Sequence, residues 1–81
     1  MTAIEKHSVL LDGHKTSVSL EREFWDALAE IAQVRGCSLN ALVAEIDRAR
    51  AGNLSSALRL YVLRRYRARS GKAPAIPEAP S

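Results

Sequence analysis

The chain of 81 residues is poor in the residue types that build crosslinks, metal sites and membrane spans. Its only cysteine, Cys37, excludes a disulfide within the chain, and neither His7 nor His14 has metal-ligand spacing to that thiol. Both histidines are expected on the surface. No run of eighteen apolar residues exists, and no apolar signal segment follows Met1. We therefore expect no metal, no membrane association and a reducing cytoplasm.

Catalytic motifs are missing as well. The sequence has no glycine-rich phosphate loop, no pair of carboxylates at catalytic spacing and no nucleophile elbow. A thiol at a helix start can be activated, but no base and acid accompany Cys37, so a small turn residue is the simpler interpretation. The sequence thus predicts no enzyme, no catalytic residue and no cofactor.

Acidic residues are absent from a long stretch of the second half. Residues 1–47 carry four Lys or Arg against eight Asp or Glu, whereas residues 48–77 carry eight basic side chains and no acidic one. This asymmetry is typical of nucleic-acid binding, although a solvated helix face gives the same pattern. The three prolines all follow residue 72, which predicts a disordered tail over residues 72–81.

A β-hairpin is expected near the N-terminus, with strands over about 7–11 and 14–20. Asp12-Gly13 suits the two-residue type I′ turn, in which both central residues have positive φ. Closure there sets Leu11 opposite His14, Val9 opposite Thr16 and His7 opposite Val18. One face then carries Val9, Leu11, Thr16 and Val18. The other face carries Lys6, Ser8, Lys15, Ser17 and Ser19, with Leu10 as the one apolar misfit.

Three helices are expected after the hairpin, over about 22–35, 38–50 and 54–69. Gly36 can adopt the left-handed conformation that ends the first helix, and Ser38 is a good N-cap for the second. Gly52-Asn53 interrupts the pattern again. We expect one mainly α domain over residues 6–69, with a short N-terminal β-hairpin.

Residues 16–28 (TSVSLEREFWDAL) and 35–43 (RGCSLNALV) together resemble the ribbon-helix-helix family of bacterial DNA-binding proteins. The stretch from His7 to Arg67, which includes NLSSALR at 53–59, is similar to small alphaproteobacterial-type members of otherwise uncharacterised role. The hairpin's first strand and the third helix are additions to the minimal fold of that family.

The resemblance implies an intertwined homodimer whose strands pair antiparallel and enter the major groove of double-stranded DNA. The alternating outward strand residues of such proteins read base edges, which here falls on Lys15, Ser17 and Ser19. The backbone amides at the start of the second helix hold DNA phosphates, which here falls on Ser38, Leu39 and Asn40. From the residues alone, Ser38 can simply cap the helix, a role that is compatible with phosphate binding at the same helix end. The strand face is by default an ordinary solvated face.

The basic third helix adds a further expectation, namely that Arg64, Arg65 and Arg67 contact phosphates. The sequence therefore predicts a sequence-specific transcriptional regulator that binds double-stranded DNA as a homodimer. The alternative is an antitoxin-like or adaptor module on the same dimeric fold, which would bind a protein partner through its C-terminal helix or tail.

Overall fold

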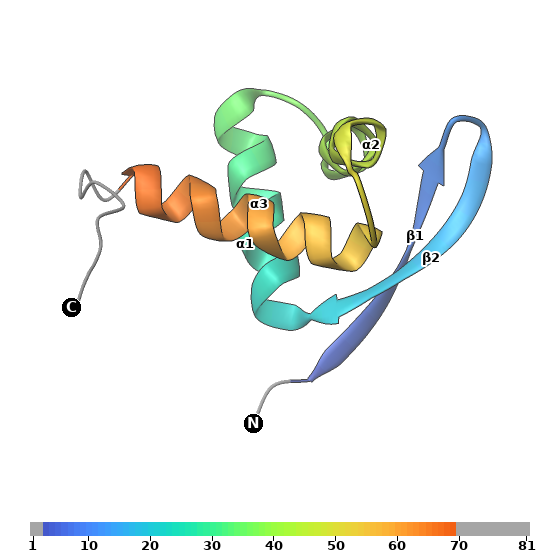
Figure 1. Cartoon of the computed structure of the whole chain (residues 1–81), viewed down its shortest axis with the longest axis horizontal. Helices are drawn as coiled ribbons and strands as arrows, with labels where there is room; N and C mark the ends of the chain where they lie inside the picture. The colour runs from blue at the N-terminus through green and yellow to red at the C-terminus, as the bar shows by residue number, and fades with distance from the viewer. Residues whose placement is uncertain (1–2, 70–81) are drawn as a thin grey trace.

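The computed structural model describes residues 3–69 and contains two strands followed by three helices (Figure 1). The elements are β1 (Ile4–Leu11), β2 (His14–Glu21), α1 (Arg22–Arg35), α2 (Leu39–Ala49) and α3 (Leu54–Arg69). The expected fold class, a mainly helical chain with an N-terminal hairpin and an extra C-terminal helix, is confirmed. The first strand begins three residues earlier than expected. The predicted tail, residues 72–81, lies outside the described residues.

The hairpin closes at the expected turn. Asp12 and Gly13 have φ values of 51° and 81°, so both central residues are left-handed, as a type I′ turn requires. The strands pair antiparallel, with Leu11 opposite His14 and Val9 opposite Thr16. The predicted register is therefore confirmed.

The helix ends follow the capping chemistry of the sequence. Gly36 has φ 78°, and the N–H of Cys37 donates to the Ala32 carbonyl at 2.9 Å, which closes α1. The hydroxyl of Ser38 accepts from the Ala41 N–H at 3.0 Å and caps α2. The end of α1 therefore lies at a glycine that can adopt the left-handed conformation. The beginning of α2 lies at a serine whose hydroxyl accepts from a free backbone N–H.

The hydrophobic core lies between one face of the hairpin and the helices, which gather on one side of it (Figure 1). Val9 and Val18 are each 4% exposed, and the helices contribute the fully buried Leu28 of α1, Leu42 of α2 and Leu58 of α3. The helices cover only part of this face. Thr16, which was expected to share the apolar face, is exposed, although Val9 directly opposite it is buried.

Trp25 anchors β1 to α1. Its indole Nε1 donates to the Glu5 carbonyl at 2.9 Å, and its ring stacks on the His7 imidazole at 4.2 Å between centroids. Both histidines were expected at the surface: His14 is exposed, and the His7 side chain keeps 39% of its surface exposed beside the stacked indole. The added first strand is therefore held to the helical body by its own side-chain contacts.

Candidate nucleic-acid interface

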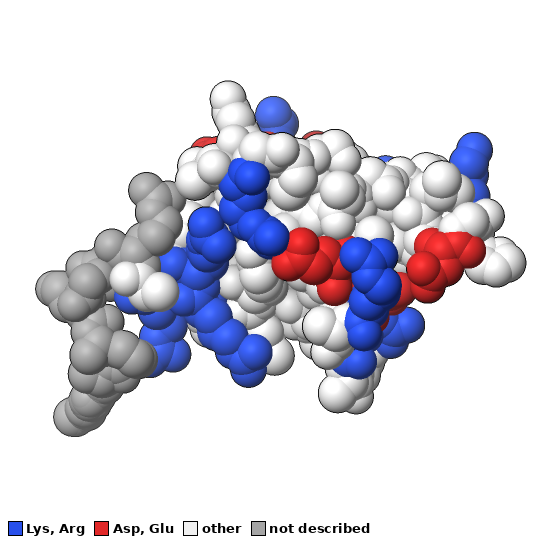
Figure 2. Space-filling model, turned by 90° about the horizontal axis from the view of Figure 1, so that it is seen from above, with Lys and Arg blue, Asp and Glu red and all other residues white. Residues whose placement is uncertain are grey.

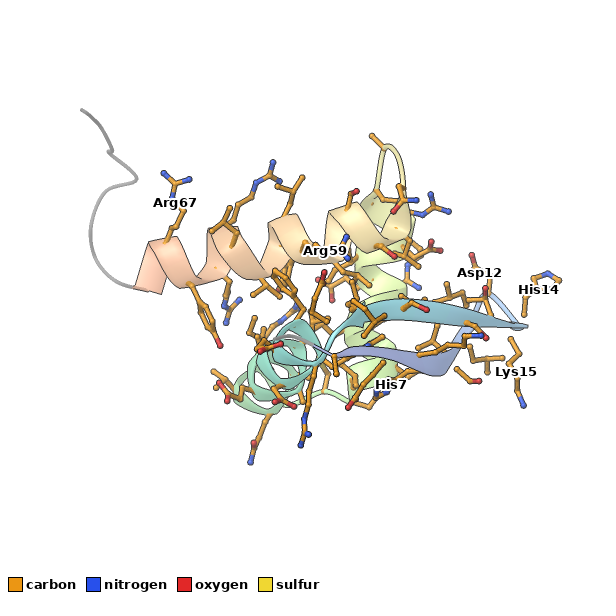
Figure 3. The ribbon with its side chains drawn as sticks, turned by 90° about the horizontal axis from the view of Figure 1, so that it is seen from below. His7, Asp12, His14, Lys15, Arg59 and Arg67 are labelled. Carbon is orange, nitrogen blue, oxygen red and sulfur yellow. The ribbon has the colours of Figure 1, made fainter. Side chains whose placement is uncertain are left out.

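The face of β2 that points away from the helices carries Lys15, Ser17 and Ser19, and all three are exposed. They alternate with the buried Val18 and Leu20, as the period of a strand requires. Lys15 lies next to the turn, and its side chain extends away from the helical body (Figure 3). The structure therefore brings the three predicted base-reading residues together on one accessible surface.

The start of α2 lies beside the outer edge of β1. The Asn40 side chain accepts from the Leu10 N–H at 2.8 Å and donates to the Leu10 carbonyl at 3.0 Å. Asn40 thus has a structural role that the sequence did not indicate, and the Ser38 hydroxyl acts as the helix cap. The hydrogen bonds of the Asn40 and Ser38 side chains do not use the backbone N–H groups of Leu39 and Asn40. These two N–H groups lie in the first turn of the helix, where no intrahelical acceptor exists.

The arginines of α3 are not brought together with the hairpin face. Figure 2 shows basic side chains gathered toward the end of the molecule where α3 finishes, and Figure 3 places Arg67 and Lys15 at opposite ends. Arg64 and Arg67 are exposed and Arg65 is half-buried. None of the ion pairs within residues 3–69 includes Arg64 or Arg65.

One ion pair fixes the junction between the hairpin and the helices. The Arg59 guanidinium of α3 donates to both carboxylate oxygens of Glu21, at 2.9 and 3.2 Å. These hydrogen bonds hold the pKa of the Glu21 carboxyl below its ordinary value of 4.5. The same guanidinium lies 5.9 Å from the centroid of the Phe24 ring. The end of β2 is therefore held against the first half of α3.

A second ion pair joins the three helices. Arg35 at the end of α1 donates to both carboxylate oxygens of Glu45 on α2, each at 3.0 Å, and to the Tyr61 hydroxyl on α3 at 3.2 Å. The bonds from Arg35 lower the pKa of Glu45, and the same partners raise the pKa of the Arg35 guanidinium. Tyr61 thus belongs to the hydrogen-bonded cluster that joins the three helices.

The outer face of the hairpin also includes Lys6, Ser8 and Leu10 of β1, which are exposed. They lie directly opposite Ser19, Ser17 and Lys15 respectively. Strand alternation predicted that Lys6 and Ser8 lie on this face but gave them no role, and Leu10 was a misfit. The signal that could have identified them is a repeat, because Lys6-His7-Ser8-Val9-Leu10-Leu11 and Lys15-Thr16-Ser17-Val18-Ser19-Leu20 share four of six residues.

An apolar groove between α1 and α3 is the other surface feature. Its apolar lining comes from Phe24, Ala27, Leu60, Val62, Leu63 and Tyr66. Leu60 and Leu63 are 45% and 49% exposed, although both are large apolar side chains. This groove was not predicted from the sequence, because the arginines of α3 interrupt its apolar pattern.

Metal and membrane features are absent from the described part of the chain. No cluster of three or more His, Cys, Asp or Glu side chains within residues 3–69 could hold a metal ion. In the same range, none of the helices combines the length and the apolar character that a bilayer crossing needs.

Known proteins share this architecture. The family described as "Ribbon-helix-helix domain" matches residues 4–66, which is most of the chain. A solved structure of an uncharacterized protein from Bordetella pertussis Tohama I is similar, with a TM-score of 0.72 and 35% sequence identity. That match covers 90% of this chain and 64% of the Bordetella chain. No curated protein matches.

Proposed function

The chain belongs to the ribbon-helix-helix family, and from this premise we propose that it is a sequence-specific transcriptional regulator. Members of the family are typically DNA-binding regulators or antitoxins, and they typically form dimers. The proposed partner is double-stranded DNA, and the proposed acting form is a homodimer. Binding of DNA would place the protein at the nucleoid in the cytoplasm.

The observation that carries the proposal is the exposed outer face of the hairpin. A lysine and two serines line β2 on the side opposite the core, and among the described residues this strand pairs with β1 alone. The major groove of B-DNA admits a two-stranded ribbon. Lysine can donate to guanine O6 and N7, and serine hydroxyls can donate to or accept from either base pair. Lys15, Ser17 and Ser19 are therefore the proposed base-reading residues.

The contacts at the start of α2 support a role in holding the DNA backbone. Asn40 fixes this helix end to the edge of β1 through Leu10, so a duplex at the ribbon would also meet the first turn of α2. Backbone N–H groups at a helix start are suited to phosphate. We propose that the amides of Ser38, Leu39 and Asn40 serve this purpose, while the Ser38 hydroxyl caps the helix.

The test is a binding titration with duplexes selected from random sequence by the wild-type protein. We expect Lys15→Ala or Ser17→Ala to lose about 1 to 3 kcal/mol of discrimination between the selected site and random DNA. Their thermal stability should stay within about 0.5 kcal/mol, because both positions are exposed. Leu63→Ala, an exposed substitution on the opposite part of the molecule, is the control.

Three outcomes would contradict parts of the proposal. Equal losses of affinity for selected and random DNA would show that β2 contacts only the DNA backbone. If the wild type selects no preferred sequence, sequence-specific DNA binding is excluded as its function. One chain per bound duplex in sedimentation of the complex would remove the homodimer as the acting form.

An antitoxin-like or adaptor function is the second candidate, and the groove between α1 and α3 favours it. Exposed Leu60 and Leu63 leave apolar surface uncovered on α3, which suits a protein partner at the C-terminal helix. Binding of such a partner should change little as salt is raised, whereas DNA binding should weaken steeply.

A further inference from the structure

We infer that a single chain supplies the complete two-stranded DNA-reading ribbon, with Lys6, Ser8 and Leu10 of β1 acting beside the residues of β2. This inference rests on the proposed DNA-binding function and goes beyond it. The family resemblance implies a ribbon made of one strand from each of two chains. Here β1 occupies, within the same chain, the place beside β2.

The register gives the hairpin the symmetry of a two-chain ribbon. In the repeat of six residues, Lys6 corresponds to Lys15 and Ser8 corresponds to Ser17, nine positions later. Ser8 lies directly opposite Ser17, so the centre of the hairpin pairs a residue with its own repeat. An approximate two-fold axis therefore passes between the two serines and places a lysine at each diagonal corner of the outer face.

The buried face follows the same symmetry. Val9 and Val18 are corresponding members of the repeat, and each is 4% exposed. Leu11 and Leu20 also correspond, and both pack against the core, with Leu20 fully buried and Leu11 half-buried. The first strand therefore reproduces both faces of the second.

Both outer edges of the hairpin are engaged by helix side chains. At the edge of β1, the Asn40 side chain of α2 accepts from the Leu10 N–H and donates to the Leu10 carbonyl. At the edge of β2, the Ser55 hydroxyl of α3 donates to the Ser19 carbonyl at 3.4 Å. A strand from another chain would have to displace these bonds. These bonds oppose the pairing of a third strand at Leu10 and at Ser19. A sheet of two strands has the width that the major groove admits.

The outer face gains three side chains with distinct chemistry. Lys6 and Ser8 repeat the donor and hydroxyl of Lys15 and Ser17, and Leu10, 53% exposed, offers an apolar contact that suits a thymine methyl group. Lys6 is opposite Ser19, four residues along β2 from Lys15, so the two lysines are about 14 Å apart along the ribbon. That span corresponds to about four base-pair steps.

The first test compares the two repeats on DNA. Lys6→Ala should reduce the ratio of specific to random binding by roughly 5- to 150-fold, as Lys15→Ala does, but at a base position about four steps away. Leu10→Ala should relax a preference for thymine, and the equally exposed Leu63→Ala is its control. If Lys6→Ala keeps the wild-type ratio of specific to random binding while Lys15→Ala lowers it, the inference is wrong and the proposed DNA-binding function is unaffected. A wild type without any DNA preference overturns both.

The second test needs no DNA. In a Cys37→Ser background, Ser8→Cys and Ser17→Cys together place two thiols directly opposite each other, and opposed residues of antiparallel strands lie within disulfide reach. Oxidation should give a crosslinked single chain on a non-reducing gel. A disulfide between two chains, or two persistent free thiols, would show that one chain does not complete the ribbon.

Discussion

At the scale of single residues, Trp25 and Asn40 decide where the added strand lies. Trp25 reaches β1 from α1 through the Glu5 carbonyl, and Asn40 reaches the same strand from α2 through both backbone groups of Leu10. One contact is near each end of the strand. Because no strand within residues 3–69 pairs with the outer edge of β1, these two side chains hold it in register against the helices.

The contribution of Trp25 can be measured by substitution. Trp25→Phe keeps an aromatic ring in the core but removes the donor to the Glu5 carbonyl, so we expect a loss of about 1 to 3 kcal/mol in the free energy of unfolding. Urea denaturation gives that value. Tyr66→Phe removes a hydroxyl that lies 3.3 Å from Glu30 at an exposed position and should cost less than about 0.5 kcal/mol. Equal effects of the two substitutions would show that the indole bond does not anchor β1.

At the scale of elements, local chemistry in the sequence predicted most of the fold. Asp12-Gly13, Gly36 and Ser38 act through bonds to neighbouring residues, so the turn and two helix ends could be predicted without knowledge of the packing. The exposure of Thr16 could not, because it depends on how far the helices extend over the hairpin. The same holds for the Asn40 side chain, whose partner is 30 residues away.

The candidate site could likewise be predicted only in part, where it depends on local properties of the sequence. Alternation along β2 was enough to place Lys15 and Ser17 on an exposed face, since the period of a strand is a local property. The separation of the α3 arginines from that face could not be predicted from their charge, because it follows from the direction in which α3 packs on the core.

The ion pairs between elements lead to a prediction about pH. Arg59 lowers the pKa of Glu21 and Arg35 lowers that of Glu45. The folded state therefore favours the ionised carboxylates more than the unfolded state does. This stabilisation is fully present above the ordinary value of 4.5 and is lost as the pH falls through the lowered pKa of the folded protein.

Urea denaturation at several pH values checks this sign. The unfolding midpoint of the wild type should fall as the solution is acidified below about pH 4.5. A Glu21→Gln, Glu45→Gln double variant should be less stable than the wild type near neutral pH and should approach it in acid. A constant difference between the two proteins across this range would show that the ion pairs do not set the pH dependence.

At the scale of the whole molecule, two polar surfaces lie at opposite ends of the longest axis. The hairpin turn is at one end, and α3 finishes at the other (Figures 1 and 3). The predicted phosphate contacts of Arg64, Arg65 and Arg67 therefore require the duplex to extend beyond the ribbon along the protein. If the duplex does not extend there, the arginines serve a different partner.

Replacement of all three arginines by alanine separates these alternatives. If they bind phosphates, binding should weaken equally on selected and random DNA, and the slope of log affinity against log salt should become shallower by about 0.9 for each phosphate that the variant no longer neutralises. Sequence preference should remain, because the outer face of the hairpin is unchanged. Arg48→Ala, an exposed arginine of α2, is the control for a general loss of positive charge. An unchanged salt slope in the triple variant would mean that α3 does not touch DNA, and the groove between α1 and α3 would then be the surface to test with protein partners.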